Sequence, residues 1–402
     1  MSRDEGRRAW PRRWRHGRPR GVRPGSGPRP RRTGGGDGRR SDAPAGRAAG
    51  IAGPLSSPRP GSGMQGRLED GVVHLPGDAR QRFHDSRGYG RPTGGDDLEV
   101  APVEAAHLLS RDDIDGVDGM GLRELLARTG TTLDFVVYKD LRDRGFYLSP
   151  AREGWPGVAD AADADFLVYP RGKGPWDGEV EHRVRVVGER ESIPVSSLGE
   201  VVLAIVDEDG DLTIFDTEGD DPEGTAAEDL PADLDAELLS DRALVWDGVD
   251  RLYQRGFFGQ RLYGRNADSG PLQLSLLEAA YLARADALAI DEADVVSRGR
   301  DVEGDRFDRR LAVYAALREA KTVPKSGFKF GSDFRVYTEF ESVDDLSHSE
   351  FLVRVVAPDH TFVPRDLSLD VRLAGGVRKR MVFALTDDNG EIDWLSVSRL
   401  TP

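Results

Sequence analysis

Three side chains near the C-terminal end of the sequence carry groups that can move protons and hold negative charge. Tyr337 supplies a phenol, His348 an imidazole and Lys379 an ammonium group. An imidazole with an ordinary pKa of about 6.5 can donate a proton near neutral pH. A lysine can stabilise an anion, and a phenol beside that lysine would be easier to deprotonate and could act as a base. Attack of a ribose 2′-hydroxyl on the adjacent phosphate needs these three functions and little else.

Each of the three residues also has an ordinary structural interpretation. A tyrosine after Phe-Arg-Val at a strand end usually packs in a core. A histidine before Ser-Glu can complete a turn, and a lysine that follows an arginine is usually solvated. The elements around them must therefore indicate whether the three side chains converge.

The surrounding segments alternate between helix and strand patterns. One face of a predicted helix carries four large residues, Phe307, Leu311, Tyr314 and Leu317. A second helix is expected from Pro364 to about Gly375. Alternating apolar residues predict strands at about 328–337, 351–356, 381–385 and 392–397. All three chemical residues then lie at element edges, where side chains can meet in one cleft.

An internal repeat organises the chain from residue 64 onward. Five segments recur in the same order at offsets between 169 and 180 residues. The pairs are Tyr89-Gly-Arg91 with Tyr263-Gly-Arg265, Glu104-Ala-Ala106 with Glu278-Ala-Ala280, Tyr138 to Arg142 with Tyr314 to Arg318, Val184 to Val187 with Val353 to Val356, and Ala204 to Gly210 with Ala384 to Gly390. The sequence therefore predicts two related α/β halves, each with a small α/β N-terminal subdomain and a nuclease-like mixed-sheet subdomain.

The repeat suggests domain limits. Residues 64–217 form the first repeat, 218–232 an acidic linker with Pro and Gly, and 233–402 the second repeat, whose nuclease core is expected at about 305–402. Residues 1–63 are rich in Arg, Gly and Pro without apolar periodicity, so they are expected to be a disordered basic extension. The alternatives for this stretch are a start codon placed too early, with Met64 as the natural start, a basic RNA-binding arm, or a targeting segment.

Charge is distributed unevenly along the 402 residues, whose formal net charge is −15. Residues 1–63 hold 16 Arg and 4 acidic residues, whereas residues 64–402 hold 40 basic and 67 acidic residues. An acidic body with only six lysines is typical of a protein that works in a high-salt cytoplasm. So negative a surface disfavours non-specific binding of nucleic acid. No apolar run approaches the length of a membrane-spanning helix.

Metal and cofactor chemistry has little support in the sequence. Cysteine is absent, and the seven histidines show no His-x₃-His spacing. Neither a Walker loop nor a Gly-x-Gly-x-x-Gly motif after a strand is present. The pairs Asp344-Asp345 and Asp387-Asp388 could bind Mg²⁺, but paired carboxylates are common in so acidic a chain. We expect neither a metal nor a cofactor.

The motifs around the three residues resemble a known family. Gly327-Phe-Lys-Phe-Gly331 through Tyr337, His348-Ser-Glu350 and Val377-Arg-Lys379, at spacings of 11 and 31 residues, resemble the C-terminal catalytic domain of the archaeal tRNA-splicing endonucleases (tRNA-intron lyases). The duplication resembles the family's homodimeric class.

The resemblance implies a role for each residue: Tyr337 as general base, His348 as general acid and Lys379 as stabiliser of the transition state. It also implies two arginines that stack on a bulged base, which match Arg372 and, less closely, Arg399. The implied partners are a second copy of the chain and a precursor tRNA with a bulge-helix-bulge. Cleavage at both intron junctions would be metal-independent and leave a 2′,3′-cyclic phosphate and a 5′-hydroxyl.

The first repeat departs from this pattern. It keeps Tyr169, but His182 is displaced toward the following strand and Gly199 lies opposite Lys379, so this half is expected to be non-catalytic. Its acidic hairpin resembles the loop by which the family's inactive unit docks on the other subunit, and the residues concerned are Asp207, Glu208, Asp209 and Asp211. A solvated turn is the alternative.

Two other functions remain open at this point. The chain could be a non-catalytic scaffold or structured-RNA-binding subunit of a nuclease, although one half retains all three chemical groups. It could also be a metal-dependent DNA nuclease with a related sheet.

Overall fold

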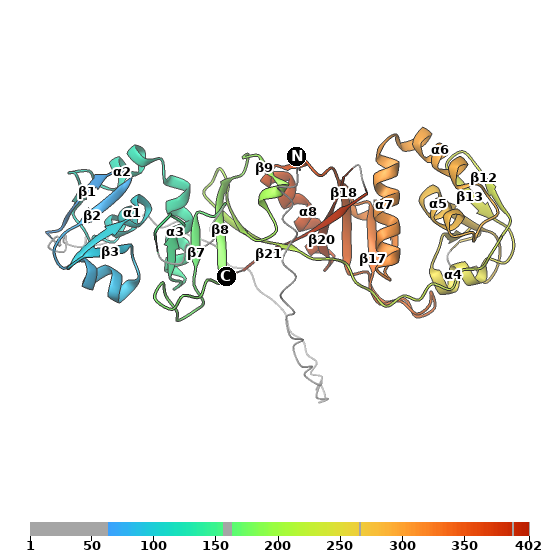
Figure 1. Ribbon diagram of the computed structural model, residues 1–402, viewed down its shortest axis with the longest axis horizontal. Helices are drawn as coiled ribbons and strands as arrows, with labels where there is room; N and C mark the ends of the chain where they lie inside the picture. Colours follow the sequence, from blue (N-terminus) through green and yellow to red (C-terminus); the bar gives the residue numbers. More distant parts are fainter. Residues whose placement is uncertain (1–62, 156–162, 265–266, 388–389, 402) are drawn as a thin grey trace, which may run out of the picture. The chain divides into compact units, whose positions relative to one another are not determined.

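A computed structural model describes residues 63–155, 163–264, 267–387 and 390–401 (Figure 1). Of the predicted basic extension only Gly63 belongs to this part, so residues 1–62 lie outside the described residues. None of the described helices is both long enough and apolar enough to cross a membrane.

Each repeat begins with a small α/β subdomain. The first has a sheet in the order β3-β4-β2-β1-β5, built from β1 (Gln65–Glu69), β2 (Val72–Leu75), β3 (Arg91–Gly94), β4 (Asp97–Val100) and β5 (Gly116–Val117), with a helical turn at Arg80–Asp85 and the helices α1 (Pro102–Ser110), α2 (Leu122–Thr129) and α3 (Thr132–Asp143). The second has a sheet in the order β12-β13-β15-β14, built from β12 (Ala236–Leu238), β13 (Arg242–Val245), β14 (Gln260–Arg261) and β15 (Leu272–Ser275), with the helices α4 (Asp250–Gly256), α5 (Leu276–Arg284) and α6 (Glu292–Glu303). The next helix, α7 (Arg306–Glu319), leads into the second half's part of the central sheet.

The two halves join in one ten-stranded mixed sheet. The first half contributes β6 (Leu148–Pro150), β7 (Phe166–Val168), β8 (His182–Gly188), β10 (Val202–Val206) and β11 (Leu212–Gly219). The second contributes β16 (Val323–Ser326), β17 (Phe334–Tyr337), β18 (Phe351–Val356), β20 (Arg380–Thr386) and β21 (Ile392–Arg399). The strand order is β16-β17-β18-β20-β21-β11-β10-β8-β7-β6, and β11 and β21 pair antiparallel at the centre. Corresponding strands of the two repeats therefore lie at equal distances from this central pair. The predicted mixed α/β fold with tandem repeats is confirmed.

Two short strands, β9 (Ile193–Pro194) and β19 (Thr361–Phe362), pair with each other and also link the halves. Each is followed by a helical segment of different length. In the second half this is α8 (Pro364–Gly376), whereas in the first half it is a single turn at Val195–Ser197. The region after β19 is therefore where the two repeats differ most in secondary structure.

The predicted elements of the second half are largely confirmed. The four apolar residues predicted for one helix face are all buried in α7, which packs on the β16, β18 and β20 side of the sheet (Figure 1). The strand expected at 328–337 is shorter, because Phe328–Phe330 form a helical turn between Gly327 and Gly331, and β17 begins only at Phe334. Gly331 has a φ of 69°, which ends that turn in a conformation that favours glycine.

Hydrogen bonds correct one of the predicted repeat pairs. The amide of Gly90 donates to the buried Glu104 (2.9 Å), and the amide of Gly259 donates to the buried Glu278 in the same way (2.8 Å). Tyr89-Gly90 therefore corresponds to Phe258-Gly259, and the predicted match with Tyr263-Gly264 is wrong. Exposure agrees, because Tyr89 is 1% exposed whereas Tyr263 is 72% exposed.

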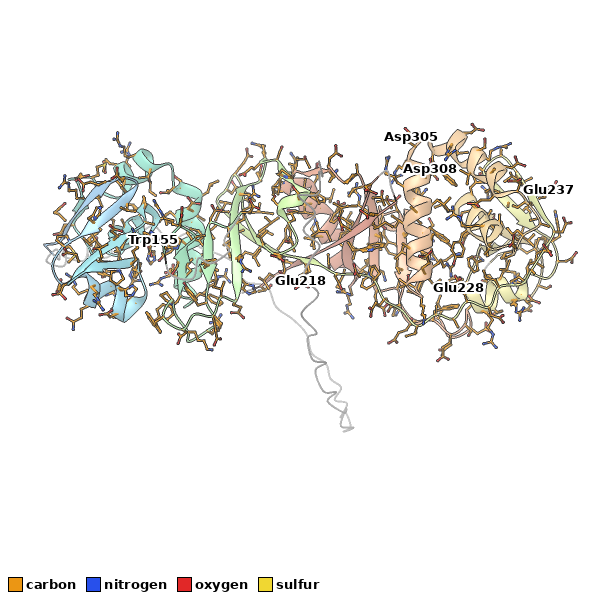
Figure 2. The ribbon with its side chains drawn as sticks, in the orientation of Figure 1. Trp155, Glu218, Glu228, Glu237, Asp305 and Asp308 are labelled. Atoms are coloured by element: carbon orange, nitrogen blue, oxygen red, sulfur yellow. The ribbon has the colours of Figure 1, made fainter. Side chains whose placement is uncertain are left out.

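The abundant carboxylates lie on the surface. Glu228, Glu237 and Asp305 are exposed, and Glu237 and Asp305 lie at the outer edge of the second half in Figure 2. Among the described acidic residues Glu104, Glu278 and Asp333 are buried. Asp333 pairs with Arg306 and Arg310, whereas Glu104 and Glu278 each lie in the first turn of a helix. A buried carboxylate costs free energy unless it is paired or protonated, so Glu104 and Glu278 must each be either paired or protonated.

Candidate active site

His348 and Lys379 line one open pocket of about 780 Å³ at the carboxyl end of β17 and the amino ends of β18 and β20. Thr338, the residue after Tyr337, lines the same pocket. Tyr337 is 6% exposed and is not among the lining residues, so the tyrosine lies behind the pocket wall. The predicted convergence is thus seen for the imidazole and the ammonium group, whereas the phenol is buried behind Thr338.

Hydrogen bonds join the three segments that carry these residues. Glu350, two residues after His348, accepts hydrogen bonds from the amide (2.8 Å) and the hydroxyl of Thr338. Lys379 Nζ donates to the carbonyl oxygen of Ser349, the residue after His348. These contacts fix the loop of His348 between the ends of β17 and α8. Sequence reasoning assigned no role to Thr338 or Glu350, although Glu350 lies within the His-Ser-Glu motif.

Lys379 lies where α8 ends, and its amide donates to the carbonyl of Ala374 (2.9 Å). Partial burial lowers the pKa of Lys379, the positive charge of Arg335 lowers it further, and Glu350 opposes the change. The ammonium group also lies 5.8 Å from the centroid of the Phe330 ring. Lys379 is therefore a half-buried cation whose charge is felt more strongly in the pocket than a solvated lysine's would be.

The cation described beside Tyr337 is Arg335 rather than Lys379. Its guanidinium lies 6.0 Å from the centroid of the Tyr337 ring, and its Nε is buried without a hydrogen-bond partner. Sequence reasoning had placed Lys379 in that position. Arg335 is thus the cation whose contact with the Tyr337 ring the structure describes.

The acidic linker contributes to the same pocket through Glu223. The next residues bond to the second half, with the amide of Gly224 donating to the carbonyl of Ala320 (2.8 Å) and the amide of Thr225 to that of Thr338 (2.8 Å). Composition alone indicated a spacer here. The structure instead places this segment against the residues that carry the candidate chemistry.

The predicted RNA-binding residues do not line the pocket. Arg372 is exposed on α8, seven residues before Lys379, and Arg399 is exposed at the end of β21, opposite Phe215 of β11. Both lie where a large ligand could reach them. Their predicted contact with bulged bases stays a prediction.

The acidic hairpin connects β10 and β11. The carboxylate of Asp207 accepts the amides of Asp209 (3.0 Å) and Asp211 (2.9 Å), so this residue stabilises its own turn. Glu208, Asp209 and Asp211 are exposed, and Glu208 forms an ion pair with Arg190. Of these three exposed carboxylates, Glu208 is therefore already paired within the chain.

Strand registers show what the first repeat lacks. Tyr169 follows β7 as Tyr337 completes β17, and the amides of Glu181 and Glu350 make the same backbone hydrogen bond. His182 then occupies the position of Phe351, three residues beyond that of His348, and Gly199 occupies that of Lys379. The displaced histidine and the missing lysine predicted for this half are therefore seen in the register.

Among the residues that the structure describes, no three His, Asp or Glu side chains gather in a way that could hold a metal ion. The pocket brings together the imidazole of His348 and the ammonium group of Lys379. Beside them the carboxylate of Glu350 binds the backbone amide of Thr338.

Comparisons with known proteins agree with this geometry. A family model described as the catalytic C-terminal domain of tRNA intron endonuclease matches residues 307–394, and the N-terminal domain of the same family matches twice, at 64–126 and 234–298. A tRNA-splicing endonuclease of Natronomonas pharaonis is 58% identical over 344 residues, which is 84% of this chain and 100% of that protein. The corresponding protein of Haloarcula marismortui is 57% identical over 84% of this chain and 100% of its own length, and that of Methanosarcina mazei 37% identical over 78% and 92%.

Proposed function

The chain belongs to the tRNA intron endonuclease family, and on that premise we propose that it cuts precursor tRNA at both intron junctions within a bulge-helix-bulge. It is an RNA endonuclease with one catalytic domain, in its second half. The observation that carries the proposal is the pocket shared by His348 and Lys379. Lys379 bonds to Ser349, and Glu350 bonds to Thr338 at the end of the strand that carries Tyr337.

The proposed reaction is a transesterification. Tyr337 removes the proton of a ribose 2′-hydroxyl, whose oxygen attacks the adjacent phosphorus. Lys379 stabilises the extra negative charge on the phosphoryl oxygens. His348 donates a proton to the leaving 5′-oxygen as its bond to phosphorus breaks. The products are a 2′,3′-cyclic phosphate and a 5′-hydroxyl.

The buried position of Tyr337 fits this scheme if the RNA backbone enters the pocket beside Thr338. Splayed bulge bases are the parts of a folded RNA that a protein can grip one at a time. Arg372 and Arg399 are proposed to stack on such a base by cation–π contact. Because the described surface is rich in carboxylates, shape and stacking must contribute more to binding than charge.

Product analysis on a bulge-helix-bulge RNA in EDTA tests the proposal. Cleavage that persists with chelator present and leaves cyclic phosphate ends would support it. Cleavage that stops on chelation and returns with Mg²⁺ would indicate a metal-dependent nuclease, and RNA binding without any cleavage would indicate a scaffold subunit.

We also propose that the active form is a homodimer that works in the cytoplasm at high salt. One candidate pocket is described per chain, and two junctions must be cut, so two copies would supply one pocket for each junction. The exposed carboxylates of the β10–β11 hairpin are proposed to dock on the partner. A monomer mass by light scattering in molar KCl would refute the dimer.

A further inference from the structure

Phe257 adopts a backbone conformation that bulky residues avoid. It follows the last turn of α4 with a φ of 51°, in the left-handed region. A large side chain is an outlier in that region, and such strain persists only where the surroundings enforce it. Phe257 is 3% exposed, so its ring is held entirely by neighbouring groups.

Those neighbours include Tyr337. The ring centroids of Phe257 and Tyr337 lie 5.9 Å apart, and Phe257 also stacks on Phe340 at 5.8 Å with an interplanar angle of 8°. Phe340 follows Tyr337 by three residues, beyond the end of β17. One ring of the N-terminal subdomain thus contacts the end of the catalytic strand at two points.

A buried ion pair also contacts the Phe257 ring. Lys325 Nζ lies 5.0 Å from its centroid and donates hydrogen bonds to Glu278 (2.7 Å) and to the carbonyl of Gly259 (2.9 Å). Burial raises the pKa of a carboxyl, but the charge of Lys325 together with the hydrogen bonds holds the pKa of Glu278 below its usual range. Lys325 belongs to β16, next to Arg335 of β17, so the pair joins α5 to the strand beside Tyr337.

The first repeat keeps the buried glutamate, as Glu104, but lacks both the ring and the lysine. Gly88, with a φ of 69°, occupies the position of Phe257, two residues before the matched Gly90. Ser149 occupies the position of Lys325. In that half the hydroxyl of Tyr169, which corresponds to Tyr337, donates instead to Ser149 Oγ (2.9 Å). The strained ring of Phe257 and the lysine Lys325 therefore occur together, in the half that holds the candidate chemistry. In that half Lys325 replaces the serine that bonds the tyrosine of the first repeat.

We propose that Phe257, held in place by the Glu278–Lys325 pair, is a positioning residue that sets the orientation of Tyr337 for proton removal. The inference rests on the proposed function, in which Tyr337 is the general base. The fold alone does not require the ring, since the first repeat builds the same turn with glycine.

The test measures single-turnover cleavage of a bulge-helix-bulge RNA by the full chain, together with RNA affinity. Phe257→Gly introduces the residue of the first repeat and relieves the backbone strain, and Phe257→Leu keeps an apolar side chain. Because a displacement of about 1 Å at a reacting group can cost about 100-fold in rate, we expect both to slow cleavage about 10- to 100-fold. RNA affinity should change by less than about 2-fold, because a positioning group acts on the rate and not on binding.

Phe257→Tyr retains the ring and should restore cleavage to within about 3-fold of the original rate. Lys325→Ser, the other residue of the first repeat, should slow cleavage in the same direction. Phe83→Leu is the matched control, because Phe83 is a fully buried ring in the first N-terminal subdomain. It should leave the rate per folded molecule unchanged.

Unchanged rates in Phe257→Gly and Phe257→Leu would overturn the inference. So would an equal loss in Phe83→Leu, or a loss that merely follows the folded fraction measured by circular dichroism in the same samples. If the original chain cuts no RNA, the proposed function fails. If it cuts and the Phe257 variants cut equally well, only the positioning role fails.

Discussion

The same substitution at the two matched buried glutamates should have opposite effects on stability. Glu104 and Glu278 each accept the amide of a matched glycine, but only Glu278 has a lysine partner. Burial raises the pKa of Glu104 to about 7 from an ordinary value of 4.5. The folded chain therefore binds a proton at this site that the unfolded chain releases between those two values.

Titration of Glu104 makes the folded state less stable as pH rises. Between about pH 4.5 and pH 7 the folded state holds more protons, so the free energy of unfolding falls as pH rises and stays lowered above pH 7. The difference between the two pKa values corresponds to about 3 kcal/mol. Glu104→Gln removes this loss but gives up one acceptor, at a cost of about 1–2 kcal/mol. The variant should be more stable than the original chain by about 1–2 kcal/mol at pH 8, and no more stable at pH 5.

Glu278→Gln should destabilise the chain by about 3–5 kcal/mol at pH 8, because it leaves Lys325 buried without a counter-charge. Urea unfolding at pH 5, 6, 7 and 8 in a fixed concentration of KCl measures both effects. Asp134, whose pKa burial raises to about 6, titrates in the same window, so the comparison must be between variant and original at each pH. The reasoning fails if both variants shift the midpoint in the same direction at pH 8, or if Glu104→Gln leaves the pH dependence intact.

Three further results are expected. His348→Ala should slow single-turnover cleavage by at least about 100-fold with RNA affinity retained, and a wild-type rate would exclude the histidine as the acid. Thr338→Val removes a hydroxyl bond to Glu350, so cleavage should fall about 10-fold with little change in unfolding; equal rates would show that this bond does not hold the pocket. Replacing Asp209 and Asp211 by Asn should weaken the dimer by about 10-fold or more in light-scattering titrations, and an unchanged dimer would remove the hairpin from the proposed interface.

Local patterns predicted much of the catalytic half. The apolar spacing of α7 and the alternation in β18, β20 and β21 come from residues close together in the chain, and such periodicity survives in the fold. The convergence of His348 and Lys379 was predictable because both lie where elements begin or end. The roles proposed for them and for Tyr337 remain predictions.

What the sequence did not indicate depends on contacts between distant segments. The pairing of Lys325 with Glu278 spans 47 residues and has no local signal. Nothing in Arg-Gly-Phe-Phe-Gly shows that Phe257 takes a left-handed conformation. The mistaken match of Tyr89 with Tyr263 arose because a short tripeptide recurs by chance, whereas the loop before the glutamate is longer in the second half: 19 residues separate Gly259 from Glu278, against 14 between Gly90 and Glu104.

The antiparallel junction of β11 and β21 has a consequence for how this protein can change over evolutionary time. In an assembly of identical single-repeat subunits, every copy must encode both the chemistry and the scaffold, so a substitution that helps one task burdens the other. Joining two repeats in one polypeptide removes that constraint, because each half can be altered without altering its neighbour. Gly88, Ser149 and Gly199 in the first half stand where the second half has Phe257, Lys325 and Lys379, so one polypeptide keeps two different sets of residues at matched positions.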